Sequence, residues 1–403
     1  MKPTTVIILG GGSNALGQIR MARDAGYRCI NIVEKGIHSF SAKSRYCKGY
    51  LAPHPYSEKE ACLEFLHRII GGLPEKPFLF FASDEWLNLV GENEAAFTET
   101  ARIPQSPWEK VSSLYNKKYL YRIAAEYGIP HPRTIELDSV SEIPAADLGQ
   151  LHPPYIAKPQ TTTSQNDLAR SGLTAYHRTQ KFGDREHLDQ WARTLAEHGV
   201  DFPVLIQEFI PGEATTLYTL TSYSGEDGGL VAGSIGHKLR QFPAEAGRIT
   251  AGILHHDDGM FRLGREFLKR VGYHGLANTE FKYDARDGQF KLMEINTRLG
   301  AWNYSSLYAG MNLLRIAVGE SLGHPYTGPA YTTAKDGYIW YNLAVDLAGA
   351  LYLNKKTGDS AHALSYGKWR RSVRPHGFEA LWDPRDPMPF LFNLYYLGKK
   401  FAF

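Results

Sequence analysis

Two acidic side chains in one predicted β-hairpin are the strongest candidates for chemistry in this sequence. The pattern predicts strands over residues 276–284 and 290–296, joined by a five-residue loop with Asp-Gly turn chemistry. Side chains alternate between the two faces of a strand, so Glu294 shares a face with Asn296. Counting back from the loop, with Asp284 paired to Phe290, predicts that Glu280 lies directly opposite Glu294.

Two like charges that face each other across a β-ladder are destabilising, so something must offset them. A divalent cation is the simplest candidate, because Glu280, Glu294 and Asn296 would supply the oxygen ligands that Mg²⁺ (or Mn²⁺) prefers. The alternative is an ordinary surface ion pair between one glutamate and Lys282 or Arg298.

The composition is that of a globular protein with several domains. The chain has 403 residues, of which 43% are hydrophobic and 22% charged, and two or three domains are expected. Its 45 Lys and Arg residues nearly balance its 42 Asp and Glu residues, which argues against a nucleic-acid-binding protein. The three cysteines, Cys29, Cys47 and Cys62, provide neither a disulfide framework nor metal-finger spacing.

No apolar run approaches the length of a transmembrane helix, and the four-residue apolar run at 6–9 is too short for a signal peptide. We therefore expect a cytoplasmic protein with no stable membrane insertion. The apolar segment 389–401, with its short basic end, is predicted to be a packed terminal helix. Contact with a membrane that carries a lipid-linked substrate is the alternative.

The first 105 or so residues alternate between strand and helix patterns. Short apolar runs at 5–10, 29–33 and 78–82 predict buried parallel strands of an open α/β sheet. The glycine-rich segment 10–17 resembles a dinucleotide-binding loop. No acidic residue caps the second strand in the expected way, although Glu34 comes close, so a substrate-binding or structural role is favoured over NAD binding.

The rest of the chain predicts a mixed α+β region. Asn116 is a predicted N-cap for a helix that ends at Tyr127, before Gly128. Predicted strands and one further helix follow, at 155–158, 204–210, 215–223, 229–239, 259–271 (the helix), 275–283 and 289–295.

At residues 293–298 the sequence Met-Glu-Ile-Asn-Thr-Arg resembles the signature of the ATP-grasp superfamily, whose last nucleotide-site strand carries Glu-x-Asn-x-Arg. Asn116-Lys117, Tyr155-Ile-Ala-Lys158 and the segment 207–213 resemble further conserved parts of that site, in family order. The resemblance covers about residues 105–320. It implies an open parallel α/β domain (1–110), a small lobe (111–210) and a large lobe with a C-terminal extension (211–403).

The resemblance also implies a role for each matching residue. The implied roles are phosphate binding for Lys117 and Lys158, adenine recognition by the backbone of Glu208 and Ile210, ribose contact for Glu213, metal binding for Glu280, Glu294 and Asn296, and catalytic stabilisation of the transferring phosphoryl group for Arg298. Each role has a structural alternative. Lys117 would be a solvated lysine at a helix start, and the segment with Glu208 and Ile210 would be an ordinary strand end before a Pro-Gly turn. Arg298 would form a salt bridge to one of the glutamates.

Segments 81–85, 238–243 and 382–387 resemble the branch of predicted carboxylate–amine ligases that includes D-aspartate ligase. Lys238 and Arg240 would then bind a carboxylate or a tetrahedral oxyanion, unless they form a basic surface strand. Asp84 follows an apolar strand and would either hold a substrate ammonium or cap a helix. Trp302 would line the acceptor pocket or belong to the core.

One departure from the superfamily concerns the flap after the second lysine. Segment 161–172 is poor in glycine, and its hydroxyl and backbone N–H groups would have to cover the phosphates.

The predicted activity is that of an ATP-dependent carboxylate–amine ligase that works through an acyl phosphate on an amino acid or another small carboxylic acid. Its partners would be small-molecule carboxylates and amines, and a homodimer stays open. The alternatives are an ATP-grasp carboxylase that uses bicarbonate, a nucleotide-binding protein without turnover, and an NAD-dependent oxidoreductase built on the first domain.

Overall fold

The computed structural model describes residues 4–160, 168, 172, 179–243, 247–356, 362–374 and 376–401. Contacts divide the chain into two units. Unit 1 comprises Met1–Val111, Leu217–Thr279 and Asn296–Phe403, and unit 2 comprises Ser112–Thr216 and Glu280–Ile295. The boundaries after Val111 and after Thr216 fall close to those expected from the sequence, at 110 and 210. The N-terminal segment and the segments 217–279 and 296–403 belong to the same unit. The division into three domains stays a prediction.

Unit 1 contains a parallel four-stranded sheet of order β3-β2-β1-β4. Its strands are β1 (Thr5–Leu9), β2 (Arg28–Glu34), β3 (Lys48–Ala52) and β4 (Phe78–Phe81). All five residues of β1 are buried, as expected of a central parallel strand covered on both faces. The expected open α/β sheet is thus confirmed.

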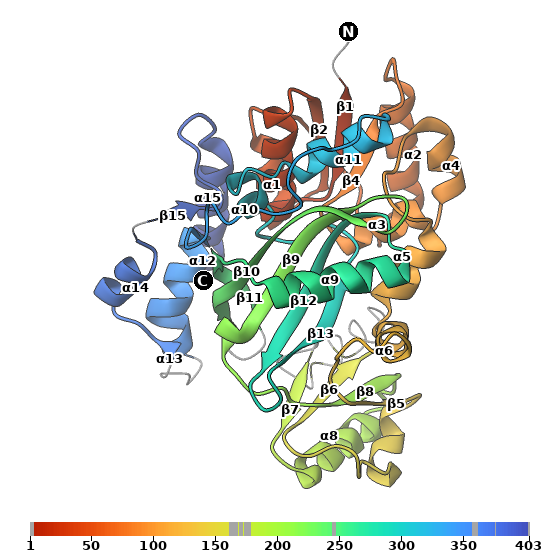
Figure 1. Ribbon diagram of the computed structural model, residues 1–403, viewed down its shortest axis with the longest axis vertical. Coiled ribbons are helices and arrows are strands. Elements are labelled where there is room, and N and C mark those ends of the chain that lie inside the picture. The colour runs from red at the N-terminus through yellow and green to blue at the C-terminus, as the bar shows by residue number, and fades with distance from the viewer. Residues whose placement is uncertain are drawn as a thin grey trace. The chain divides into compact units, whose positions relative to one another are not determined.

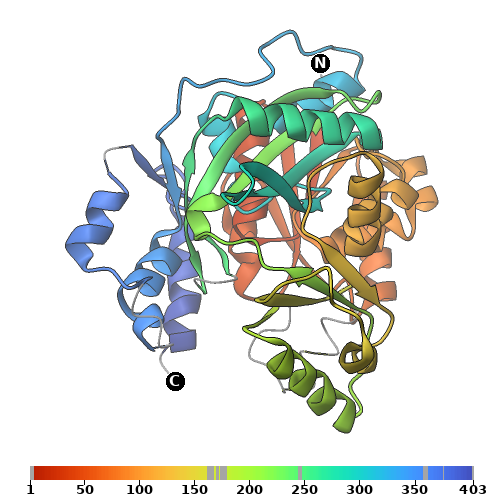
Figure 2. The ribbon, with the colours of Figure 1, turned by 60° about the horizontal axis from the view of Figure 1, so that its bottom comes forward.

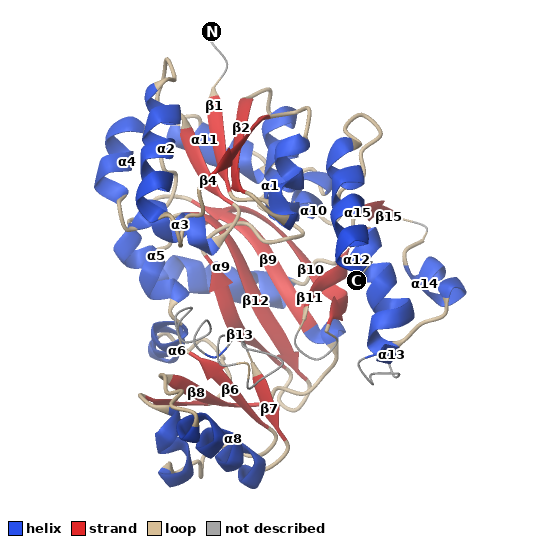
Figure 3. Cartoon of the chain, turned by 180° about the vertical axis from the view of Figure 1, so that it is seen from behind, coloured by secondary structure: helices blue, strands red, loops and turns tan. Residues whose placement is uncertain are grey.

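Helices flank this sheet (Figure 3). They are α1 (Gly12–Asp24), η1 (Ile37–Lys43), α2 (Lys59–Gly71), α3 (Asp84–Gly91), α4 (Glu94–Thr100) and α5 (Trp108–Tyr115), the last of which crosses the boundary between the units. The glycine-rich turn before α1 packs tightly, because a Cβ atom on Gly11 would lie 2.4 Å from the His38 carbonyl oxygen. Close packing therefore gives this turn a structural reason for its glycine.

A second sheet has seven strands in the order β13-β12-β9-β10-β11-β14-β15. The strands are β9 (Leu217–Ser224), β10 (Leu230–Phe242), β11 (Arg248–Leu254), β12 (Gly275–Asp284), β13 (Gln289–Asn296), β14 (Ile339–Tyr341) and β15 (Gly377–Glu379). Residues 280–295, the outer part of the β12–β13 hairpin, are counted with unit 2.

Helix α9 (Asp258–Val271) packs against β9 and β10. Its ends follow capping rules: Asp257 accepts a hydrogen bond from the Met260 N–H, and Gly272 ends the helix in a left-handed conformation. The two short helices that follow the hairpin are α10 (Tyr304–Tyr308) and α11 (Leu313–Ser321). Together with α1 they share one hydrophobic core with β1, β4 and β9, which joins the first and second sheets within unit 1.

The last 60 or so residues add four short helical segments and two strands to unit 1. The helical segments are α12 (Leu343–Ala348), the π-helix η4 (Gly349–Leu353), α13 (Asn354–Lys356) and α14 (Tyr366–Ser372). The final helix is α15 (Met388–Phe401), which confirms the predicted terminal helix. These elements gather on one flank of unit 1 (Figure 1).

Unit 2 is built on an antiparallel four-stranded sheet of order β5-β8-β6-β7. Its elements are α6 (Lys117–Glu126), β5 (Thr134–Leu137), η2 (Val140–Ala145), β6 (Tyr155–Pro159), β7 (Gln180–Phe182), α8 (Arg185–Glu197), β8 (Val204–Glu208) and η3 (Ala214–Thr216). Helix α8 covers one face of the sheet (Figure 2), and its buried residues Leu188, Ala192 and Leu195 join the core of this unit.

Two strand ends differ from expectation. The strand predicted over 204–210 ends at Glu208, and the strand predicted over 215–223 begins only at Leu217, after the helical turn η3. Pro211 and Gly212, the latter with a φ of 111°, lie between these strands and interrupt the extended backbone.

The hairpin loop is also shorter than predicted. β13 begins at Gln289 and leaves four loop residues instead of five. The Gly288 N–H donates to the Asp284 carbonyl, and Gly288 has a φ of 71°, which glycine adopts without strain. A glycine-dependent turn thus closes the loop one residue early.

Candidate active site

Lys158 is the centre of a charged group in unit 2. It lies near the end of β6, while Glu280 and Glu294 come from the neighbouring strands β12 and β13. Burial lowers the pKa of Lys158 to about 8, and the negative charges of Glu294 and Glu280 act in the opposite direction. The structure therefore brings both predicted glutamates within electrostatic reach of the predicted phosphate-binding lysine.

A chain of hydrogen bonds orients the Lys158 side chain. Its ammonium donates to Gln207 Oε1 at 2.8 Å, and Gln207 Nε2 donates to Thr134 Oγ1 at 2.8 Å. The Thr134 hydroxyl in turn donates to the Pro132 carbonyl at 2.9 Å, so it acts as an acceptor toward Gln207. This arrangement fixes which amide atom of Gln207 faces the lysine, and Gln207 is only 1% exposed.

Helix α6 presents Lys117 and Tyr121, which lie four residues apart and so share one face of the helix. The predicted N-cap is confirmed, since Asn116 accepts a hydrogen bond from the Lys118 N–H. The Tyr121 hydroxyl donates to the Met293 carbonyl at 2.7 Å. Burial raises the pKa of Tyr121 to about 12, with opposing effects of Gln207 and Lys117 and a smaller raising effect of Glu294. Tyr121 thus ties the helix of the first lysine to the strand of the second glutamate.

The predicted adenine segment follows β8. The Ile210 side chain is buried, and no hydrogen bond among the described residues involves its amide N–H, the group expected to face a base. Glu213 is exposed and lies just before η3. These positions are compatible with the predicted adenine contact of the Ile210 backbone and the predicted ribose contact of Glu213, and both roles stay predictions.

The side chain of Glu208 belongs to an ion cluster at the hairpin turn. Arg286 and Lys291 contact it at 3.2 and 3.7 Å, and the Arg133 N–H donates to it at 2.9 Å. The same two cations contact the fully buried Asp284 at 2.6 and 2.7 Å. Because all these residues belong to unit 2, the cluster holds the predicted hinge strand to the turn of the carboxylate hairpin.

The donor set of the predicted metal site fits a hard cation. Two carboxylates on adjacent strands and the amide of Asn296, two residues beyond Glu294, are oxygen ligands of the kind Mg²⁺ takes. Asn296 Oδ1 also lies 3.5 Å from an Arg298 guanidinium nitrogen. Among the residues that the structure describes, no group of three or more His, Cys, Asp or Glu residues could hold a metal ion.

Arg298 and Asp84 form a pair within unit 1. Arg298 Nε and Nη2 donate to the two Asp84 carboxylate oxygens at 2.7 and 2.9 Å, a bidentate geometry. Asp84 is therefore one ion-pair partner of Arg298. Asp84 is not the helix N-cap, because Ser83 occupies that position and Asp84 is the first residue of α3.

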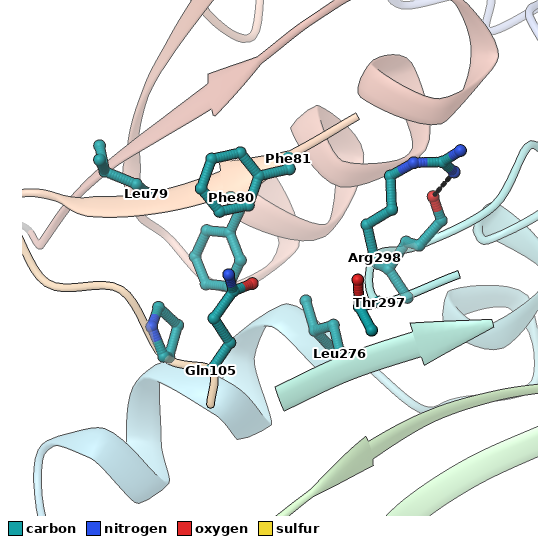
Figure 4. A pocket seen from close by; sticks show the side chains of 9 residues that line it. Leu79, Phe80, Phe81, Gln105, Leu276, Thr297 and Arg298 are labelled. Atoms are coloured by element: carbon teal, nitrogen blue, oxygen red, sulfur yellow. Dashed lines mark hydrogen bonds between the residues drawn. The ribbon is translucent and has the colours of Figure 1, made fainter. Parts of the chain in front are cut away.

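Arg298 also lines a small pocket at the carboxyl end of β4 (Figure 4). The other lining residues come from four segments of unit 1: Leu79, Phe80, Phe81, Pro104, Gln105, Leu276, Thr297 and Leu299. Carboxyl ends of parallel strands are where open α/β sheets bind ligands. Arg298 therefore borders this pocket and also pairs with Asp84.

Arg240 is engaged in a buried network. Its guanidinium donates to both Asp346 carboxylate oxygens, at 2.9 and 2.7 Å, and to Ser372 Oγ at 2.8 Å. Asp346 is 1% exposed and also accepts from Thr250 Oγ1 and Trp369 Nε1. The network ties β10 and β11 to the C-terminal helices, which gives Arg240 a structural role that the sequence did not predict.

Lys238 and Trp302 lie elsewhere in unit 1. Lys238 is buried and its ammonium donates to Gln241 at 3.3 Å, while a β-bulge after Lys238 interrupts the register of β10. Trp302 is 3% exposed, and a Cβ atom on Gly236 would lie 2.2 Å from its ring. Of the two readings of Trp302, the core position is the one observed.

Comparisons with known proteins identify the fold. A D-aspartate ligase from Enterococcus faecium is 26% identical over 267 residues, which are 64% of this chain and 62% of that relative, so the match spans less than two thirds of its length. An N5-carboxyaminoimidazole synthetase from Staphylococcus aureus, complexed with ADP, has a TM-score of 0.63 at 14% identity and covers 87% of this chain and 86% of its own. The chain has the ATP-grasp fold.

Two further solved structures share this fold. An L-amino acid ligase from Bacillus licheniformis has a TM-score of 0.59 at 15% identity and covers 80% of this chain and 75% of its own. A biotin carboxylase from Campylobacter jejuni has a TM-score of 0.59 at 15% identity and covers 83% of this chain and 74% of its own. No protein-family model matches the chain.

The sequence analysis gave no role to Gln207 and Tyr121, which lie beside the group around Lys158. Both carried a signal: Gln207 is a polar residue that directly follows three apolar strand residues, and Tyr121 is one helical turn after Lys117. The glycine-poor flap at 161–172 lies outside the described residues apart from Leu168 and Gly172.

Two further predictions from the sequence concern the cysteines and membrane-spanning helices. Cys29, Cys47 and Cys62 are free thiols. Within the described ranges, no helix has both the length and the apolar content needed to cross a bilayer.

Proposed function

We propose that this protein is an ATP-dependent ligase that joins a carboxylate to an amine through an acyl phosphate. The observation that carries the proposal is the group of Lys158, Glu280 and Glu294, with Lys117 and Tyr121 beside it in the same unit. The D-aspartate ligase relative supports ligation, whereas the fold alone is shared by ligases and carboxylases.

MgATP would be bound chiefly by residues of unit 2, whereas Asn296 is counted with unit 1. Lys117 and Lys158 would neutralise phosphate charge, and the Glu208 carbonyl and the Ile210 N–H would face the adenine edge. Glu280, Glu294 and Asn296 would hold Mg²⁺ (or Mn²⁺), which lowers the negative charge on the phosphates when it is bound.

The reaction follows from this binding. A substrate carboxylate oxygen attacks the γ-phosphorus of ATP, the bond from that phosphorus to the β,γ-bridging oxygen breaks, and ADP leaves. The amine nitrogen then attacks the carbonyl carbon of the acyl phosphate, inorganic phosphate leaves, and the nitrogen releases a proton. Exclusion of water protects the acyl phosphate during these steps.

Unit 1 would supply the substrate contacts. Arg298 and Asp84 form a cation and an anion side by side, so the guanidinium would receive the acyl phosphate or substrate carboxylate and Asp84 would receive an ammonium group. A zwitterionic amino acid matches such a pair. Lys238 remains a second candidate for binding a carboxylate. The supply of ATP places this activity in the cytoplasm, and no nucleic acid is required.

The decisive experiment is a screen for ADP release with pairs of carboxylates and amines, beginning with D- and L-aspartate. Glu294→Gln should abolish turnover, because it removes one negative charge and one oxygen ligand of the metal site. Glu266→Gln, which removes an exposed carboxylate on α9, is the matched control and should keep normal turnover.

Each alternative has its own result in that screen. ADP release that requires bicarbonate and not an amine would identify a carboxylase, and tight ATP binding without turnover would identify a binding protein. A saturable NAD(H) fluorescence change without any effect of ATP would favour the oxidoreductase. Normal turnover in Glu294→Gln would show that the metal assignment is wrong.

A further inference from the structure

Helix α15 exposes an apolar stripe, which consists of Met388, Leu391, Leu394 and Tyr395. Their side chains are 47%, 49%, 39% and 55% exposed. The spacing of three, six and seven residues places them on one face of a helix. The other face is packed: Asn393 is buried, α15 contacts η1, and the Lys43 ammonium lies 5.0 Å from the centre of the Phe392 ring.

Exposed apolar side chains are concentrated in this part of the chain. The stripe is joined by Tyr352, Tyr366 and Trp382, which are 61%, 57% and 46% exposed. These seven side chains are half of the 14 large apolar side chains that are exposed among the described residues, and they fall within residues 352–395. Within this part of the chain, the four residues of the stripe share one helix face and form the candidate interaction surface.

The surroundings of the stripe are positively charged. Lys43 and Arg45, from and after η1, and Arg385, just before α15, are exposed. The helix itself contains no acidic residue.

The two carboxylates that precede α15 are held by hydrogen bonds inside the unit. Asp386 is 1% exposed and accepts from Ser44 Oγ at 2.6 Å and from the Arg45 N–H at 2.9 Å. Asp383 accepts from the Tyr46 hydroxyl at 3.1 Å. The charged side chains beside α15 that are exposed, Lys43, Arg45 and Arg385, are thus cations, while Asp383 is half-buried and Asp386 buried.

We propose that the α15 stripe docks on an anionic phospholipid surface, with the helix lying in the plane of the interface. An apolar face flanked by basic residues is the pattern of interfacial helices, which bury the apolar side chains among the lipid headgroups and attract anionic lipid. Tyr395 and Trp382 have the amphipathic rings that favour this depth. With 14 residues, α15 is too short to span a bilayer.

A second copy of the chain is a poorer occupant for the stripe. A two-fold interface places the same surface of each copy against the other. The basic rim of one copy would then meet the basic rim of the next, and like charges across an interface are unfavourable. An anionic lipid surface offers the opposite charge together with an apolar layer.

The experiment is co-sedimentation of the full chain with vesicles of phosphatidylcholine alone and of phosphatidylcholine mixed with phosphatidylglycerol. We expect binding to the anionic vesicles only, and we expect binding to weaken as salt is added. Leu391→Gln should reduce the affinity for anionic vesicles about tenfold, because it removes one apolar side chain from the lipid contact. Arg385→Gln should weaken binding at low salt and have little effect at high salt.

Leu322→Gln is the matched control, since Leu322 is 40% exposed at the end of α11 and lies outside the stripe. It should bind vesicles as the unchanged protein does, and thermal unfolding should be the same for all three variants. Failure of the unchanged protein to bind anionic vesicles would overturn the proposal. A dimer that forms without lipid and is lost in Leu391→Gln would overturn it in favour of a second copy. Because the readout is lipid binding, its result is independent of whether the protein is a ligase.

Discussion

At the scale of single residues, Lys158 depends on a neighbour that has no predicted contact with substrate. Gln207 can accept from Lys158 only because its amide nitrogen is already used on Thr134. A buried lysine with a lowered pKa needs such an acceptor to keep its position and charge at the proposed phosphate site. Gln207 is therefore a positioning residue for the lysine.

Gln207→Leu should weaken ATP binding about tenfold, because it removes a hydrogen bond to a charged group, typically about 1.5–3 kcal/mol. Gln207→Glu keeps an acceptor toward the ammonium and should restore most of the affinity. Calorimetric titration with MgATP measures both effects. Gln190→Leu, an exposed glutamine on α8, serves as the control. Equal affinities in Gln207→Leu and Gln190→Leu would contradict the positioning role.

The guanidinium of Arg240 is already bonded to Asp346 and Ser372 within the protein. Arg240→Ala should lower the free energy of unfolding by about 3–5 kcal/mol, since it leaves the buried Asp346 without its cation. Urea unfolding measures the change, and Arg262→Ala, an exposed arginine on α9, should have almost no effect. A stable Arg240→Ala variant with altered substrate preference would instead support the predicted role in the acceptor pocket.

At the scale of elements, the turn between β12 and β13 carries an ion cluster that fixes the carboxylate hairpin. Hydrogen bonds from Arg286 and Lys291 hold the pKa of Asp284 well below its ordinary range, against the effect of burial. The folded state therefore favours the ionised carboxylate more than the unfolded state does. Stability from this group is present above the unfolded pKa of about 3.9 and is lost as the pH falls below it.

Asp284→Asn should lower the free energy of unfolding by about 3–5 kcal/mol at neutral pH, because two partly buried cations lose their common partner. The difference from the unchanged protein should shrink in acid, where the carboxylate becomes protonated. Urea unfolding followed over a pH series tests both statements. Asp287→Asn is the control in the same turn, with a more exposed carboxylate that pairs with Lys291 alone. A difference that persists in acid would contradict the assigned cause.

Much of the element scale could be predicted from local pattern. The Asn116 cap, the strand with Lys158, the hairpin and the terminal helix all follow from short segments whose apolar spacing and capping residues agree. The prediction that was wrong also depends on local residues. The strand predicted over 204–210 ends at Glu208, because Pro211 and Gly212 interrupt the extended backbone. Strand ends depend on such single positions.

The ion-pair partners of the arginines could not be predicted, because the packing of segments that are distant in the sequence decides them. Asp84 lies 214 residues from Arg298, and Asp346 lies 106 residues from Arg240, yet each pair is bidentate. The sequence analysis singled out Asp84, Arg240 and Arg298 as candidate site residues, but not Asp346. Nothing in the local sequence around an arginine specifies which of 42 acidic residues will meet it.

At the scale of the whole molecule, Arg20 connects a helix near the N-terminus to residues near the C-terminus. It is 4% exposed in α1 and donates to the carbonyls of Ala380 and Leu381 at 2.7 Å each. Its guanidinium also lies 4.5 Å from the centre of the Tyr304 ring. The first helix of the parallel sheet is thereby bonded to the segment that leads into α15.

Arg20→Met should lower the free energy of unfolding by about 3 kcal/mol, because two buried carbonyls lose a charged donor. It should also speed proteolytic cleavage near residue 382, while Arg28→Met, an exposed arginine at the start of β2, should not. Limited proteolysis with mass spectrometry locates the cut, and urea unfolding gives the stability. Unchanged cleavage in Arg20→Met would show that other contacts suffice to hold the segment.

The interleaving of the two units has a consequence for the newly made chain as it leaves the ribosome. Unit 2 has its last segment once residue 295 has been synthesised, whereas unit 1 includes residues from both termini. The partners of Arg20 are added only 360 residues after it. During that interval α1 and its sheet must wait with apolar surface exposed, which is when a nascent protein most needs a chaperone.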